Sequence, residues 1–111
     1  MPECIAIVDP GGHLLAFTRM DGAFTQSIDS AIAKARTAAS FGVPSRYGNV
    51  SNEIKLQMAS QGQRVNLFGG LSIIVDGHVI GAFGIGSATR EEDLALAKIA
   101  ITAIEGAQRL D

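Results

Sequence analysis

The stretch "FGGLSIIVDGHVIGAFGIGS", residues 68 to 87, constrains the fold most, because it places six glycines among apolar β-forming residues. Its centre, Asp76-Gly77, is the dipeptide typical of a two-residue hairpin turn. The flanking runs, 71–75 and 79–85, are the two strands. A phosphate-binding loop needs its glycines between a strand and the first turn of a helix. Here they lie in a turn and in or beside strands, which predicts a bulge or a closely packed neighbour at the strand glycines.

A second hairpin is predicted at the start of the chain. "ECIAIV" (3–8) is rich in β-branched residues, and "HLLAFTRM" (13–20) has the character of the returning strand. The "DPGG" between them is a turn, because proline presets one backbone angle and glycine permits positive φ. Strand alternation would place Leu15, Phe17 and Arg19 on the side of the core.

Three further segments have helical character. In "SIDSAIAKARTAAS" (27–40), small residues recur every fourth position, so one stripe of this helix can lie close to a sheet. "NEIKLQMASQ" (52–61) predicts a short helix closed by Gly62, and a capping box at 89–92 begins a C-terminal helix. Two hairpins separated by helices predict a single α+β domain over 1–111, an antiparallel sheet with helices packed on it.

Composition narrows the function classes. Charged residues are 18% of the chain, below the usual value of about 25%, which favours self-association through uncharged surface. The net charge of −2 and the lack of a basic run argue against a nucleic-acid partner. There is no apolar run of about 20 residues for a membrane span. A single cysteine and the lack of a signal peptide lead us to expect a reducing, cytoplasmic location.

Two cations are candidates for binding an anion, and each has an alternative. Arg19 either anchors an anion in a cavity or forms an ion pair with Asp21 at the end of its strand. Lys34 lies beside the small-residue stripe, where it either reaches over the buried face or is solvated. Cys4, in a strand, is expected to be a buried, inert thiol.

The histidines, His13 and His78, occupy or adjoin hairpin turns, where exposure is expected. The chain has no HxH, HExxH or Cys/His cluster, so we expect no dedicated metal site.

Four motifs in order resemble the GlcG/HbpS family, which also includes the C-terminal domain of PduO-type proteins. They are "VDPGGHLLAFTRMDGA" (8–23), "AIAKARTAASFGVPS" (31–45), the stretch 68–87 and "DLALA" (93–97). The resemblance implies a profilin-like antiparallel sheet of about five strands with helices on both faces. It also implies homo-oligomers, a ligand such as haem or a corrinoid, and a place in a catabolic pathway.

By resemblance, the recurrent positions of the family match six residues here: Arg19, Asp21, Lys34, Phe68, Gly69 and Gly70. Cations near a glycine pair favour a small anionic ligand, a carboxylate or a haem propionate. If haem binds, the sequence offers several axial ligands: Met20, Met58, Tyr47 and His78. We expect a small-molecule-binding protein. The alternative is a small enzyme that acts on a carboxylated substrate, with Asp21 or Lys34 as the proton-transfer group.

Three departures from the family pattern stand out. The usual helix before "IAIVD" is missing from this sequence. Ser72 stands where the family commonly has proline. "GIGSATREED" (84–93) replaces the usual "GVSG" and acidic helix start, which bears on the identity of the ligand.

Overall fold

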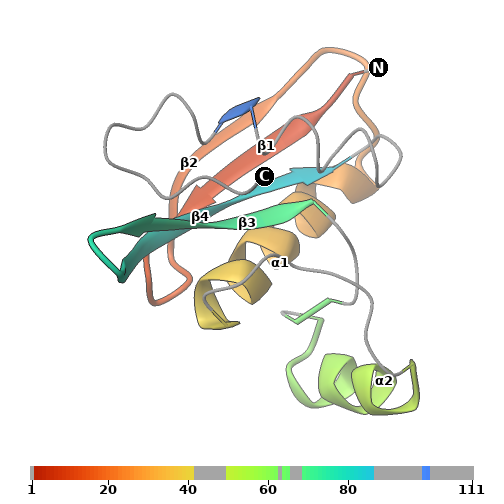
Figure 1. Cartoon of the computed structure of the whole chain (residues 1–111). Coiled ribbons are helices and arrows are strands. Elements are labelled where there is room, and N and C mark those ends of the chain that lie inside the picture. The colour runs from red at the N-terminus through yellow and green to blue at the C-terminus, as the bar shows by residue number, and fades with distance from the viewer. Residues whose placement is uncertain (1, 42–49, 63, 66–68, 87–98, 101–111) are drawn as a thin grey trace.

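A four-stranded antiparallel sheet with a helix across one face forms the body of the protein (Figure 1). The computed structural model describes residues 2–41, 50–62, 64–65, 69–86 and 99–100. Its sheet has the strand order β2-β1-β4-β3. The elements in chain order are β1 (Cys4–Val8), β2 (Leu14–Arg19), α1 (Gln26–Phe41), α2 (Val50–Ala59), β3 (Gly70–Val75) and β4 (His78–Gly86).

The α+β class, both hairpins and the first two helices are confirmed. The described residues form four strands, where the family resemblance implied about five. As predicted, the short helix α2 closes at Gly62, whose N–H donates to the Gln57 carbonyl at 2.8 Å. The helix predicted from Thr89 lies outside the described residues except at 99–100, which are helical.

Small residues bring α1 close to β4. A Cβ atom added at Gly84 would meet the Ala31 carbonyl oxygen and, at 2.6 Å, the Ala35 nitrogen. Real Cβ atoms do not approach backbone so closely, so only glycine fits at this position. The core on this face is accordingly built mostly of alanine: Cys4, Ala6, Val8, Ala31, Ala35, Ala38, Ala39 and Ala82. The close packing predicted from the small-residue stripe is therefore confirmed.

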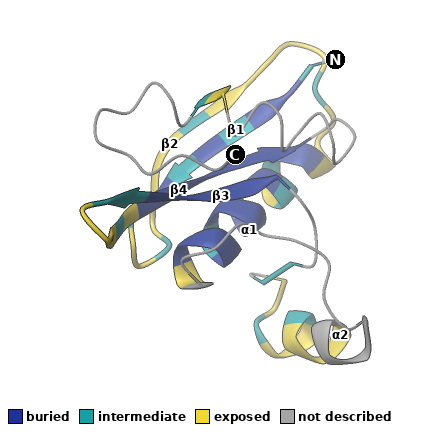
Figure 2. Cartoon of the chain, in the orientation of Figure 1, coloured by how far each residue is buried: buried dark blue, intermediate teal, exposed yellow. Residues whose placement is uncertain are grey.

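The opposite face of the sheet carries the larger apolar side chains. Buried there are Leu71, Ile73, Phe83 and Ile85, with Ile5, Ile7 and Ala100 packed against them. Figure 2 shows that burial is concentrated in β1, β3, β4 and α1, while β2 and α2 are largely exposed. The small side chains therefore determine how closely α1 approaches, and the large ones fill the other face.

The glycines of β3 and β4 have the roles predicted for them. Asp76 and Gly77 have φ angles of +50° and +78°, as a type I′ hairpin turn requires. The β3–β4 register shifts next to Ile73, which pairs with Gly81. A Cβ atom at Gly81 would lie 2.5 Å from the Val8 carbonyl oxygen, so the bulge brings two backbones close together.

β2 is an edge strand, and the face predicted for Leu15 is wrong. A register shift in the β1–β2 pairing places Leu14, and not Leu15, opposite Val8. The alternation inferred from sequence breaks there, and Leu15 is 66% exposed. Phe17 does pack against the alanine-rich core. Arg19 lies opposite Cys4 in the register, and so on the predicted face, but its side chain is exposed.

The β1–β2 turn is organised by the Asp9 carboxylate. Its Oδ1 atom accepts hydrogen bonds from the backbone N–H groups of Gly11 and His13, both at 2.9 Å. These bonds, that from His13 above all, hold the pKa of the Asp9 carboxyl below its usual value. The turn is therefore an Asx-type turn stabilised by a charged acceptor.

We predict that Gly84→Ala destabilises the protein by roughly 3 kcal/mol, because the added methyl group meets backbone that cannot rotate away. Gly77→Ala is the control: its Cβ atom meets nothing within 4 Å, and it carries only the cost of a left-handed backbone, about 1 kcal/mol. Urea unfolding measures both. Equal losses in the two variants would contradict the close approach of α1 to β4.

We predict a pH-dependent difference in stability between the natural protein and Asp9→Asn. Asparagine keeps an Oδ1 acceptor but does not titrate. Since the folded pKa of Asp9 is lowered, its charge stabilises the fold above the unfolded pKa of about 3.9. That contribution is lost as the pH falls through the lower folded pKa. The difference in unfolding free energy should therefore be present at about pH 5 and shrink below about pH 4. A constant difference down to about pH 2 would refute this role.

Candidate functional site

The predicted ligand-binding residues come to one end of the sheet, but not to one point. β2 ends at Arg19, which pairs with Cys4, and Cys4 pairs with Gly86 of β4. β3 begins nearby at Gly70. With adjacent strands about 4.8 Å apart, Arg19 and the start of β3 are separated by roughly 14 Å. Asp21 follows β2 and is exposed.

Lys34 is buried, with 5% of its surface exposed, so the alternative of a solvated lysine is wrong. Its Nζ atom donates a hydrogen bond to the Ile85 carbonyl at 2.9 Å. The Ile85 N–H in turn donates to the Gly69 carbonyl at 3.0 Å. The structure therefore brings Lys34 to the glycine pair through β4. Phe68 lies outside the described residues, and the ligand-binding role of all six residues stays a prediction.

Two side chains singled out in the sequence have structural roles. Cys4 is buried as expected, and burial raises the pKa of its thiol while Arg19 opposes the shift. A protonated thiol is a poor nucleophile. Ser72 donates its hydroxyl to the Ala38 carbonyl at 2.8 Å, a contact that proline at this position could not make. Ser72 therefore ties β3 to α1.

A cavity of about 580 Å³ lies elsewhere, beside the β1–β2 turn. We call it the Gly12 cavity. Arg36 of α1 forms part of its wall and donates from Nε to the Gly12 carbonyl at 2.9 Å. Residues after α2 close another side, where the Val65 N–H donates to Thr37 Oγ1 at 3.0 Å. The lining residues are Pro10, Gly11, Gly12, His13, Arg36, Thr37, Ser40, Ser60 and Arg64.

A second cavity of about 440 Å³ shares Arg36 with the first. Its wall mixes the aliphatic side chains of Leu14, Ile32 and Ala33 with Asp29, Gln61 and Gly62. Arg36 therefore lies between two cavities that both have polar and apolar lining residues.

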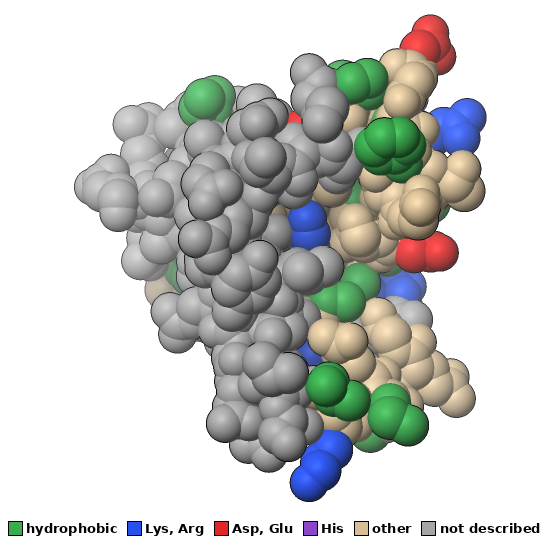
Figure 3. Space-filling model, turned by 90° about the vertical axis from the view of Figure 1, so that its right-hand side faces the viewer, with side chains coloured by type: hydrophobic (Ala, Val, Ile, Leu, Met, Phe, Trp, Pro, Cys, Tyr) green, Lys and Arg blue, Asp and Glu red, His purple; other side chains and the backbone are tan. Residues whose placement is uncertain are grey.

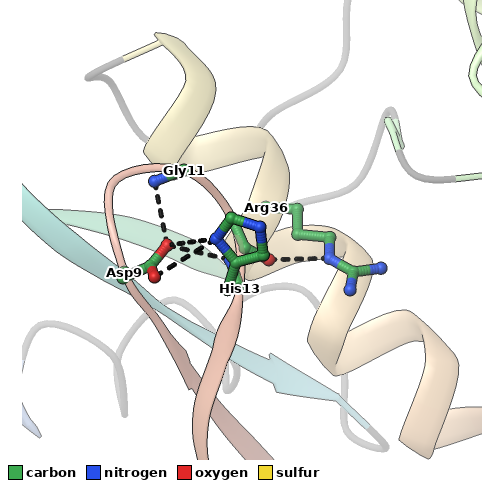
Figure 4. A network of polar contacts seen from close by, with 5 residues as sticks. Asp9, Gly11, His13 and Arg36 are labelled. Atoms are coloured by element: carbon green, nitrogen blue, oxygen red, sulfur yellow. Dashed lines mark hydrogen bonds and ion pairs between the residues drawn. The ribbon is translucent and has the colours of Figure 1, made fainter.

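His13 stands at the rim of the Gly12 cavity, held by Asp9 (Figure 4). The His13 Nδ1 atom lies 3.3 Å from both Asp9 carboxylate oxygens. The imidazole is otherwise open, with 82% of the side chain exposed. His13 is exposed, as predicted from its place in a hairpin turn, whereas no role was predicted for Asp9. The signal for Asp9 was an aspartate directly before Pro-Gly-Gly, which is typical of an Asx turn.

Arg36 and Arg64 were also missed as a pair. No local pattern joins them, because Arg64 comes to the same cavity as Arg36 only through the contact of Val65 with Thr37. Basic, acidic and hydrophobic side chains are interspersed over the described part of the face in Figure 3. Arg36 and Arg64 both line the Gly12 cavity.

The described residues contain no group of three or more His, Cys, Asp or Glu side chains that could hold a metal ion. No helix among them is long and apolar enough to cross a membrane.

The chain is similar to several known proteins over most of its length. An uncharacterized 15.0 kDa protein of the dhaT-dhaS intergenic region of Citrobacter freundii is 37% identical, in an alignment covering 91% of this chain and 75% of that protein. Protein GlcG of Escherichia coli K12 is also 37% identical, over 73% of this chain and 61% of GlcG.

Solved structures share the fold. The structure of a PduOC:haem complex matches with a TM-score of 0.85 and 29% identity, over 99% of this chain and 83% of that chain. HbpS matches with a TM-score of 0.76 and 28% identity, over 95% of this chain and 74% of that chain.

The family resemblance noted in the sequence is confirmed by a family model. The model of the HbpS-like family, described as "Haem degrading protein HbpS-like", matches residues 1–102. The chain belongs to the HbpS-like family.

Proposed function

We propose that this chain is a small-molecule-binding protein whose ligand is haem, held at the Gly12 cavity through its propionate groups. Two findings support haem as the ligand: the family description and the similarity to a protein crystallised as a haem complex. The location is supported by the two arginine residues in the wall of this cavity.

The observation that carries the proposal is the presence of Arg36 and Arg64 in one cavity of about 580 Å³. Guanidinium groups bind carboxylates through paired, charge-assisted hydrogen bonds. Haem carries two carboxylates on one side of an apolar ring. The volume is within the range of about 300 to 1,000 Å³ typical of ligand sites. A corrinoid carries mainly neutral amides at its periphery, so the arginine pair favours haem.

The residues present suit the anionic end of such a ligand, because Arg36 and Arg64 both line the Gly12 cavity. In the neighbouring cavity, Leu14 and Ile32 stand beside Asp29 and Gln61. Bound haem would supply a redox-active iron, and the protein would supply orientation and charge.

We also propose that the protein self-associates. The outer edge of β2 has no strand beside it among the described residues, and Leu15 is exposed on it. Exposed strand edges commonly pair with another chain, and a second copy of this chain would cover both the edge and the side chain.

We predict that Arg64→Ala weakens hemin binding by about tenfold or more, the usual scale for a lost charged hydrogen bond. Absorption titration in the Soret region measures the affinity. Arg19→Ala is the matched control, since it removes an exposed arginine at the other end of the sheet and should leave the affinity unchanged.

The same titration with haem dimethyl ester, whose two carboxylates are blocked as uncharged esters, tests whether the protein recognises the carboxylates. The natural protein should bind the ester less tightly than hemin, and Arg64→Ala should bind the two alike. Equal binding of ester and hemin by the natural protein would contradict carboxylate recognition. A loss confined to Arg19→Ala would move the site to the opposite end of the sheet.

A further inference from the structure

The Gly12 cavity has a polar wall that a porphyrin ring does not require. Its described lining residues carry two guanidinium groups, hydroxyl groups and an imidazole, and Pro10 supplies the one apolar side chain among them. No aspartate or glutamate is found among these described lining residues, although the chain as a whole has a net charge of −2. The cavity is therefore locally cationic and hydrophilic.

Separate contacts hold the two arginines in this wall. Arg36 donates from Nε to the Gly12 carbonyl at 2.9 Å, which fixes the plane of its guanidinium beside the β1–β2 turn (Figure 4). The Arg64 N–H donates to Ser60 Oγ at 3.1 Å, so Arg64 is tied to the residue that follows α2. Because the two guanidinium groups come from different parts of the fold, a ligand with two negative charges suits them better than a ligand with one.

Two hydroxyl groups of the wall serve the fold. Thr37 donates from Oγ1 to the Ala33 carbonyl at 2.8 Å and accepts from the Val65 N–H at 3.0 Å. Ser60 donates from Oγ to the Gln57 carbonyl at 3.3 Å. These bonds shape the wall, so recognition of a ligand depends mainly on the arginines.

We propose that the Gly12 cavity binds a small hydrophilic organic dianion, a dicarboxylate or a phosphate ester, and that this ligand competes with haem. Guanidinium groups pair with carboxylate and phosphate oxygens through the same kind of charge-assisted hydrogen bonds. A single ion pair near water contributes little to affinity, so both arginines are needed. Anion binding rests on the cavity alone, whereas competition rests on the proposed function, because both ligands use the same arginines.

The test is isothermal titration calorimetry of the haem-free full chain with succinate, butyrate and phenylsuccinate, at neutral pH and constant ionic strength. Succinate and butyrate have the same number of carbon atoms but differ in charge, and phenylsuccinate adds a large apolar ring. The natural protein should bind succinate about tenfold more tightly than butyrate, the usual scale for a charged hydrogen bond. It should bind phenylsuccinate no more tightly than succinate.

Equal binding of succinate and butyrate would overturn recognition of two charges. Clearly tighter binding of phenylsuccinate would overturn the hydrophilic class of ligand. Glycerol phosphate, titrated in parallel, distinguishes a phosphate ester from a dicarboxylate, and failure of both to bind would overturn the inference.

Arg64→Ala should bind succinate about tenfold more weakly and lose the preference over butyrate. Arg64→Lys keeps the positive charge and should retain part of that preference. Arg19→Ala is the matched control, because it removes an exposed arginine at the other end of the sheet and should bind succinate like the natural protein. A loss in Arg19→Ala as large as in Arg64→Ala would overturn the location.

A hemin titration with and without succinate separates this inference from the proposed function. Succinate should raise the apparent dissociation constant of hemin in the natural protein, and should have much less effect in Arg64→Ala. Hemin binding that saturating succinate leaves unchanged would overturn the competition. Succinate binding without hemin binding would overturn the proposed function and leave the anion site standing.

Discussion

The close approach of two backbones, α1 against β4, sets the geometry of the rest of the described structure. Gly84 has no side chain, so the Ala31 carbonyl and the Ala35 nitrogen can lie where a Cβ atom would otherwise be. At this distance, a side chain of the helix or the sheet can form a hydrogen bond with the backbone of the other. Lys34 reaches the Ile85 carbonyl and Ser72 reaches the Ala38 carbonyl, at 2.9 and 2.8 Å. Dispersion and hydrogen bonding therefore act across one tight interface.

The same placement builds the candidate site. α1 lies close enough to the β1–β2 turn for Arg36 to donate to the Gly12 carbonyl at 2.9 Å. Thr37, the residue after Arg36, accepts a hydrogen bond from the Val65 N–H. This bond holds the segment that carries Arg64 against α1. Two arginines distant in the sequence thus come to one cavity because a helix bridges a turn and a loop. The Asp9 carboxylate holds the turn, and with it His13, on the other side.

Local chemistry was enough to predict the elements. The Asp76-Gly77 turn, the strand glycines and the alanine stripe of α1 each depend on residues close together in the chain. Their patterns can therefore be recognised in the sequence. The features that were predicted wrongly or left open depend on strand pairing and packing. The exposure of Leu15 follows from a register shift in β1–β2, and the burial of Lys34 follows from a carbonyl on a distant strand. The family resemblance predicted a site at the end of the sheet with Arg19 and Gly70. The cavities at the other end were not predicted, because their lining residues are distant in the sequence and come together only in the folded chain.

Backbone amide shifts in nuclear magnetic resonance, recorded as a diamagnetic zinc protoporphyrin is added, show which end of the sheet holds the ligand. The largest shifts should fall on Gly11, Gly12, Arg36 and Ser60, around the cavity between α1 and the β1–β2 turn. Shifts concentrated on Arg19, Lys34, Gly69 and Gly70, with the turn unchanged, would contradict this location.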